Sequence, residues 1–164
     1  LHLPWPRGNR VAIITPTGGG ATVSLDAMEQ HGFELAQLSE KTFNAIKEFF
    51  PSWPPPLNPI DVMAAGLRHG YKEVYRASLK ALLEDENVDA ILCITGFLTL
   101  KTISATIQGK NKPVITWVLG EWGESVLSKV KETGYQAIYP TPERAFRALA
   151  ASRDYSEKRL NSTV

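Results

Sequence analysis

The segment from residue 11 to residue 22 constrains the fold more than any other part of this chain. Its apolar start, Val-Ala-Ile-Ile at 11–14, has the β-branched enrichment of a buried strand, and three consecutive glycines follow at 18–20. The next residues, 21–30, are suited to a helix. A strand that turns through glycines into a helix exposes backbone N–H groups at the helix N-terminus, where the helix dipole adds positive charge. The segment therefore predicts an anion site for phosphate or carboxylate groups, and the alternative is a turn that binds nothing.

Strand-like and helix-like segments alternate along the rest of the chain. The expected strands are residues 10–15, 34–38, 88–95, 113–119 and 136–139. The expected helices are residues 21–30, 39–50, 71–84, 99–107, 123–132 and 142–150. This alternation predicts an α/β fold, a flavodoxin-like three-layer, doubly wound parallel sheet of five strands in the order 2-1-3-4-5. Ligands of such folds bind at the carboxyl ends of the strands, near the switch between strands one and three.

We expect one folded domain over residues 10–150, preceded by a linker at 1–9 and followed by a polar tail at 151–164. Its 18 basic and 17 acidic residues leave a net charge of +1, which argues against a nucleic-acid partner. The sequence shows no signal peptide and no apolar span of transmembrane length. The single cysteine, Cys93, lies in an apolar run and fits a reducing compartment. A cytoplasmic chain without a membrane partner is therefore expected.

Several motifs stand in a specific order along the chain. The first strand and its glycines are followed by His31-Gly32 and then by Asn58-Pro59-Ile60-Asp61. A helix-to-strand passage ends in Val-Asp-Ala at 88–90, and residues 134–145 form a closing strand and helix. Over residues 7–149 this order resembles the last flavodoxin-like domain of the NDP-forming acyl-CoA synthetases, the family of succinyl-CoA synthetase and ADP-forming acetate–CoA ligase.

The resemblance implies part of an acid–thiol ligase that is inactive alone. In this family a phosphohistidine lies between the N-termini of two helices from related domains, and this chain would supply one of them. The residues implied to hold the phosphoryl group are Thr17, Gly18, Gly19, Gly20, Ala21 and Thr22. The backbone can do this without a positive side chain, because a helix N-terminus itself stabilises a phosphoryl group.

The resemblance also implies partners for the complete enzyme. These are CoA-binding, phosphohistidine and ATP-grasp domains in the same or another chain, together with a small carboxylic acid or acyl phosphate. ATP or another nucleoside triphosphate, Mg²⁺ and CoA are implied for the whole enzyme, but none is expected to bind to this chain alone. No metal-ligand spacing of His, Cys and carboxylates occurs, so we expect neither a metal site nor a catalytic side chain here.

The acid pocket is implied to include Pro16 and the turn formed by Gly96, Phe97 and Leu98. Pro16 stands where the family usually has Asn, a substrate contact in succinyl-CoA synthetase. Phe97 falls in the place of a Gly-Gly turn that touches the acid there, which suggests a more apolar acid or none. Asn58 and Asp61 are expected to be structural residues near this site, with Asp61 capping the following turn.

Two alternatives remain open. None of the three histidines, His2, His31 and His69, stands in the family's His-Thr-Gly setting. The chain could therefore be a non-catalytic regulatory ligand-binding module of a protein acetyltransferase-type fusion, a role that Pro16 and Phe97 fit. The residues at 15–18, Thr-Pro-Thr-Gly, are also loosely similar to the phosphate loop of FMN-binding flavodoxins.

Overall fold

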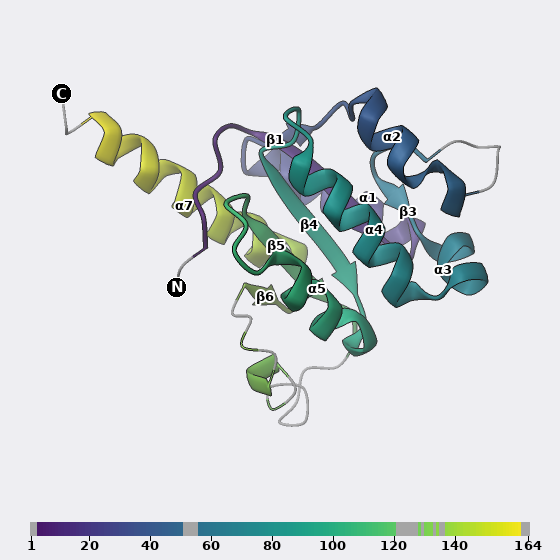
Figure 1. Ribbon diagram of the computed structural model, residues 1–164. Coiled ribbons are helices and arrows are strands. Elements are labelled where there is room, and N and C mark those ends of the chain that lie inside the picture. The colour runs from purple at the N-terminus through teal and green to yellow at the C-terminus, as the bar shows by residue number, and fades with distance from the viewer. Residues whose placement is uncertain are drawn as a thin grey trace.

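The structure is a computed structural model that describes residues 3–50, 56–120 and 137–161, together with residues 128, 130–132 and 134. A twisted sheet lies between two layers of helices (Figure 1). Its strands are β1 (Arg10–Thr15), β2 (Glu34–Leu35), β3 (Ile60–Asp61), β4 (Ala90–Thr95), β5 (Val114–Val118) and β6 (Ile138–Tyr139). The helices are α1 (Gly18–Gln30), α2 (Glu40–Ile46), α3 (Met63–His69), α4 (Tyr71–Glu84), α5 (Leu100–Ile107) and α7 (Pro142–Asn161), with 3₁₀ turns η1 (Lys47–Phe49) and η2 (Phe97–Thr99).

The sheet is parallel throughout, in the order β2-β1-β4-β5-β6. This confirms the flavodoxin-like fold and the order 2-1-3-4-5, in which β4, β5 and β6 are the third, fourth and fifth expected strands. A sixth strand, β3, pairs with the end of β1 through Ile14 and Thr15. We expected only an extended segment there, because two residues are too few to show strand periodicity.

Both faces of the central strands are buried, which explains why β1 and β4 have continuous apolar sequences. On one face, Ile14 and Cys93 pack under α2, α4 and α5. On the other face, Ile13 and Leu92 pack under α1 and α7. The chain therefore passes to one face of the sheet after β1, where α1 packs, and to the opposite face after β4, where α5 packs.

Several expected boundaries differ in the structure, and two of them concern glycines. Helix α1 begins at Gly18 rather than after the glycines, so the three glycines form its first turn. Helix α3, residues 63–69, has no counterpart among the expected helices. There Gly66 packs so closely on the Tyr71 ring that a side chain would clash with it, a tertiary contact that local sequence does not reveal.

The last helix is longer than expected. Helix α7 continues through the polar segment after residue 150 as far as Asn161. Arg153 donates to the carbonyl oxygen of Gly32 at 3.0 Å and lies 4.6 Å from the centre of the Phe33 ring. The N-terminal segment also crosses α7, where Trp5 meets Tyr155 edge to face with ring centres 6.0 Å apart (Figure 1). These contacts hold a segment whose own composition is polar.

The expected helix at 123–132 and the residues 51–55 of the proline-rich connector lie largely outside the described residues. Among the described helices, none combines the length and the apolar character needed to cross a bilayer.

Candidate anion site at the carboxyl end of the sheet

The carboxyl ends of β1 and β4 lie side by side and lead to helices on opposite faces of the sheet. This is the position at which doubly wound folds form a ligand crevice. The structure therefore brings the turn after β1, with Pro16 and Thr17, beside the turn after β4, which begins at Gly96. These two turns were far apart in the sequence and were expected to meet.

Thr15 controls how the chain enters α1. Its buried hydroxyl accepts the N–H of Thr17 at 3.2 Å and donates to the carbonyl oxygen of Thr17 at 2.8 Å. Thr17 is the N-cap residue in an extended conformation, and its carbonyl accepts the first helical bond, from Ala21, at 3.1 Å. One buried hydroxyl thus sets the direction of the first turn of α1.

The backbone N–H groups of Gly18, Gly19 and Gly20 precede the first helical hydrogen bond. Such groups have no partner within a helix, and the Thr17 side chain does not cap them. Among the described residues, no other group accepts a hydrogen bond from them. They add to the positive end of the helix dipole and form a row of donors suited to an anion.

The three glycines do not serve the same purpose. None of them has a positive φ, so none is needed for a left-handed backbone conformation. A Cβ on Gly18 would meet nothing within 4 Å, and one on Gly19 would meet only the Thr17 hydroxyl at 3.8 Å. A Cβ on Gly20 would lie 3.0 Å from Cγ2 of Thr17, so packing requires Gly20. Gly18 and Gly19 instead leave open space above the free donors.

The turn after β4 is held by hydroxyl groups. Thr95 and Thr99 share a hydrogen bond, and the Thr95 hydroxyl also donates to the carbonyl oxygen of Gly96 at 3.2 Å. The hydroxyl of Tyr75, from α4, donates to the carbonyl oxygen of Ile94. Burial raises the pKa of Tyr75 far above its usual range, so this hydroxyl stays protonated. The end of β4 is therefore rigid before any ligand arrives.

The residues expected to form an acid pocket lie around these turns without converging. Gly96 is exposed, Leu98 is 80% exposed, and Pro16 is half-buried. Phe97 packs against a small apolar cluster that includes Leu100 and Val118. The structure thus places these residues on one edge of the sheet, and the acid pocket stays a prediction.

Asn58 fills a gap in the sheet beside β1. Its side-chain oxygen accepts the N–H of Ile13 at 2.9 Å, and its side-chain nitrogen donates to the carbonyl oxygens of Val11 and Ala36, both at 2.9 Å. The amide thereby replaces the strand partner that is missing between β2 and β3. Asp61 is exposed and accepts the N–H of Met63 at 2.9 Å, as the cap of the turn into α3.

No ionisable side chain lies between Thr15 and Thr22, so within this segment the backbone donors are the source of positive potential. His31 is the C-cap of α1, at the opposite end from these donors. His69 lies in α3, with its ring 5.7 Å from that of Phe49. Cys93 is buried, which raises the pKa of its thiol well above the usual range. Within the described part of the chain, no group of three or more His, Cys, Asp or Glu side chains could hold a metal ion.

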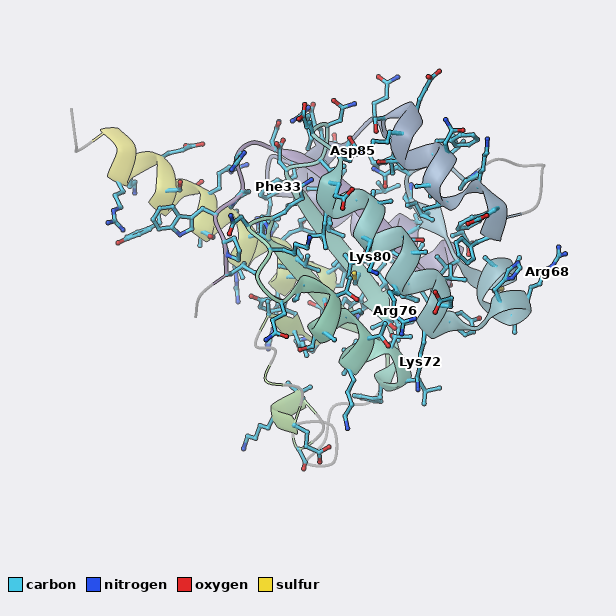
Figure 2. All side chains as sticks on the ribbon, in the orientation of Figure 1. Phe33, Arg68, Lys72, Arg76, Lys80 and Asp85 are labelled. Carbon is cyan, nitrogen blue, oxygen red and sulfur yellow. The ribbon has the colours of Figure 1, made fainter. Side chains whose placement is uncertain are left out.

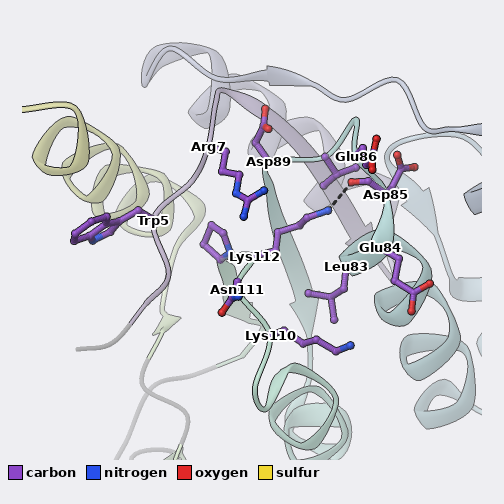
Figure 3. A pocket seen from close by; sticks show the side chains of 12 residues that line it. Trp5, Arg7, Leu83, Glu84, Asp85, Glu86, Asp89, Lys110, Asn111 and Lys112 are labelled. Atoms are coloured by element: carbon purple, nitrogen blue, oxygen red, sulfur yellow. Dashed lines mark hydrogen bonds between the residues drawn. The ribbon is translucent and has the colours of Figure 1, made fainter. Parts of the chain in front are cut away.

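A cavity of about 380 Å³ opens at the opposite, amino end of the sheet (Figure 3). Several of its charged side chains are engaged in the fold. Lys112 donates to the carbonyl oxygens of Leu82 and Asp85 at 2.8 and 2.6 Å and so caps the end of α4. Asp89 accepts three hydrogen bonds from Arg10. These contacts were not predicted from the sequence, because bonded partners such as Arg10 and Asp89 are 79 residues apart.

No protein-family model matches the sequence. The chain is 32% identical over 160 residues to the alpha subunit of acetate–CoA ligase [ADP-forming] II from Pyrococcus furiosus, with 91% of this chain and 34% of that subunit covered. A crystal structure of a Pyrococcus horikoshii protein matches with a TM-score of 0.80 and 28% identity, covering 94% of this chain and 37% of the other. An acetyl-coenzyme A synthetase of Ca. Korarchaeum cryptofilum, in complex with phosphate and ADP, matches with a TM-score of 0.74 and 29% identity, covering 96% and 36%. The chain therefore spans about a third of the length of these relatives.

Proposed function

Because this chain is a domain of the NDP-forming acyl-CoA synthetase family, we propose that it serves an acid–thiol ligase and needs further domains for turnover. Its relatives are about three times as long, which leaves room for those domains. Residues 10–150 would form the ligase domain proper. Companion domains would supply the histidine that carries the phosphoryl group, the CoA site and the ATP-grasp site with its nucleotide and Mg²⁺.

The specific role proposed for this chain is to hold the phosphoryl group at the N-terminus of α1. The observation that carries it is the row of N–H groups at Gly18, Gly19 and Gly20, which have no acceptor among the described residues, with Gly18 and Gly19 exposed and free of neighbours that a side chain would crowd. These donors are fixed in place by Thr15 before a ligand binds, so little reorganisation is needed when charge arrives. Thr17, Ala21 and Thr22 would complete the cradle. The phosphate bound to the Korarchaeum relative is consistent with such chemistry.

Open glycine surface favours this role over a purely structural turn. Glycine lowers helix stability relative to alanine by about 1 kcal/mol. Gly18 and Gly19 have helical conformations and room for a side chain, so the chain's own fold gives no reason for glycine. A phosphoryl group brought close to the backbone supplies that reason, since a side chain there would keep it away.

The acid would bind beside the phosphoryl group, at Pro16 and the turn of Gly96, Phe97 and Leu98. The half-buried Pro16 and the exposed Leu98 would give an apolar wall. This lining suits the hydrocarbon part of an acid better than a second carboxylate.

A phosphate titration of the chain followed by amide NMR tests the phosphoryl site. We expect weak binding with shifts centred on residues 17–22, because one helix N-terminus is only part of the proposed cradle. Gly19→Val should abolish the shifts by placing two methyl groups over the donors.

Gly96→Val is the matched control, because a Cβ there also meets nothing within 4 Å and its φ of −92° is open to any residue. This variant should still bind phosphate. Shifts that map elsewhere, or that survive in Gly19→Val, would reduce the segment to a connector. The unaltered chain, incubated with ATP, Mg²⁺, CoA and short acids, should form no acyl-CoA, and robust turnover would contradict the need for companion domains.

A further inference from the structure

The solvent side of α3 and α4 carries four basic side chains at four-residue spacing, Arg68, Lys72, Arg76 and Lys80. Figure 2 shows Lys72, Arg76 and Lys80 in a row along α4, with Arg68 apart from them on α3. Arg68, Lys72 and Lys80 are exposed, and the side chain of Arg76 is 42% exposed. The opposite side of α4 is buried in the core, so the row lies where the helix faces outward.

Acidic groups balance this row only in part. Glu73 pairs with Arg76. In the part of the chain that the structure describes, no ion pair forms at Lys72 or Lys80. Helix α5 packs beside α4 and adds Lys101 without any acidic residue. Positive charge is thus concentrated on one face of a chain whose net charge is only +1.

The row does not stabilise α4. Like charges four residues apart repel one another along a helix. Lys72 also lies in the first turn of α4, where the helix dipole disfavours a cation. The helix is held by its buried side, which includes Val74, Leu79 and Leu82. An opposite charge outside this domain would remove the repulsion.

Two exposed apolar side chains lie on α3, which packs against α4. Met63 and Leu67, one helical turn apart, are 45% and 76% exposed. Apolar contacts surrounded by charge are typical of protein–protein interfaces. Nucleic-acid surfaces combine a basic excess of the whole domain with exposed rings for base stacking, and this face has neither. The relatives' greater length means that further domains are available to contact this one.

We propose that the α3–α4 surface, formed by Met63, Leu67, Lys72, Arg76 and Lys80, docks an acidic face of a companion domain of the ligase. Apolar side chains of that domain would cover Met63 and Leu67, and its carboxylates would meet the basic row. The docking rests on the chain being part of a larger ligase, and not on the phosphoryl site at α1. The two proposals can be tested separately, because the phosphate titration monitors residues 17–22 and the experiment below monitors the α3–α4 surface.

Carbodiimide cross-linking of the full-length ligase, or of its co-purified subunits, tests the docking, because this reagent joins amines to carboxylates in direct contact. We expect cross-links from Lys72 or Lys80 to Asp or Glu of a companion domain. Their yield should fall at least about fivefold at about 1 M NaCl, where the Debye length is about 3 Å.

Charge reversal by Lys72→Glu/Lys80→Glu should loosen the contact and speed amide exchange in α3 about tenfold in the full-length protein. Lys47→Glu/Arg147→Glu makes the same charge change at exposed positions outside this surface and should leave the exchange unchanged. Cross-links confined to the 164 residues of this chain would overturn the proposal. So would a gel shift of poly(U) that Lys72→Glu/Lys80→Glu abolishes, since it would assign the surface to nucleic acid.

Discussion

At the amino end of the sheet, Asp85, Asp89 and Lys112 are paired within the chain. At the carboxyl end, the first backbone donors of α1 have no acceptor among the described residues. Asp85 accepts hydrogen bonds from the backbone and hydroxyl of Ser39 and from Asn87. Gly18 and Gly19 are exposed, and their N–H groups have no acceptor among the described residues. Paired groups stabilise a fold, and unpaired donors next to open space bind something else. The comparison separates the part of this domain that maintains the fold from the part proposed to act.

The largest expected effect tests the amino end. Asp85 is 3% exposed, and Asp85→Ala removes the three hydrogen bonds that its carboxylate accepts. The substitution thereby breaks the contact between Ser39, at the start of α2, and the end of α4. We expect urea unfolding to show a loss of about 2–3 kcal/mol. Asp26→Ala, at an exposed position on α1, is the control and should change stability by less than about 0.5 kcal/mol. Equal losses of unfolding free energy in both variants would contradict a stabilising role of the Asp85 hydrogen bonds.

A smaller change in the free energy of unfolding is expected when the pH is lowered. Burial raises the pKa of Asp85, but hydrogen bonds from Thr42, Ser39 and Asn87 outweigh it and hold the pKa below its usual range. The pKa of Asp89 is lowered in the same way, by Arg10. A carboxyl with a lowered folded pKa stabilises the protein above its unfolded pKa, and this is lost as pH falls through the folded value.

We therefore expect the free energy of unfolding to decline as pH drops below about 4, with little change from this source above it. Urea unfolding at a series of pH values measures the decline. Asp85→Ala should flatten it, since one of the two groups is gone. A decline that is just as steep in the variant would assign the acid sensitivity to other carboxylates.

At the carboxyl end the sign of the stability effect should reverse. Gly18→Ala and Gly19→Ala add a methyl group where there is room and where φ is not positive, so each should stabilise the domain by up to about 1 kcal/mol. Both should weaken phosphate binding. Thermal unfolding and the phosphate titration measure the two effects on the same samples. Gly20→Ala, whose Cβ would crowd Thr17, should not be stabilising and serves as the contrast.

The smallest effect is expected at Asp61. Its single hydrogen bond to the N–H of Met63 is exposed. Asp61→Ala should cost about 0.5–1 kcal/mol, as the loss of an ordinary helix cap does. Urea unfolding measures it against Asp61→Asn, which keeps an acceptor oxygen and should lose less. A loss as large as that of Asp85→Ala would place Asp61 among the structural contacts.

Local chemistry made much of the fold predictable from the sequence. The hydroxyl of Ser39 accepts the N–H of Thr42 at the start of α2, three residues away, as its type and position indicated. Gly32 ends α1 with φ of +72°, a conformation that glycine adopts without strain. The continuous apolar runs at β1 and β4 are typical of strands buried on both faces, and the alternation of strands and helices led to the order that the sheet has.

The candidate site was predictable in place but not in detail. The glycines and the switch between strands one and three located it at the carboxyl end of the sheet. The sequence did not show that α1 begins at Gly18, because this depends on the Thr15 hydroxyl holding both polar groups of Thr17. Glycine was therefore interpreted as a turn residue, although the structure places it in the helix.

The sequence by itself determined most of the strands and helices, though not β3 or α3, because caps, glycines and apolar runs act within a few residues. Only the tertiary structure decided which polar side chains bond the free backbone groups of distant elements. Asn58 completes the sheet beside Ile13, 45 residues away, and Arg153 joins α7 to the carbonyl of Gly32 across 121 residues. A single sequence carries no signal for such pairs, since either polar side chain could equally be exposed to solvent. The amide and the guanidinium acquire their roles only when packing brings them to backbone groups that would otherwise lack a partner.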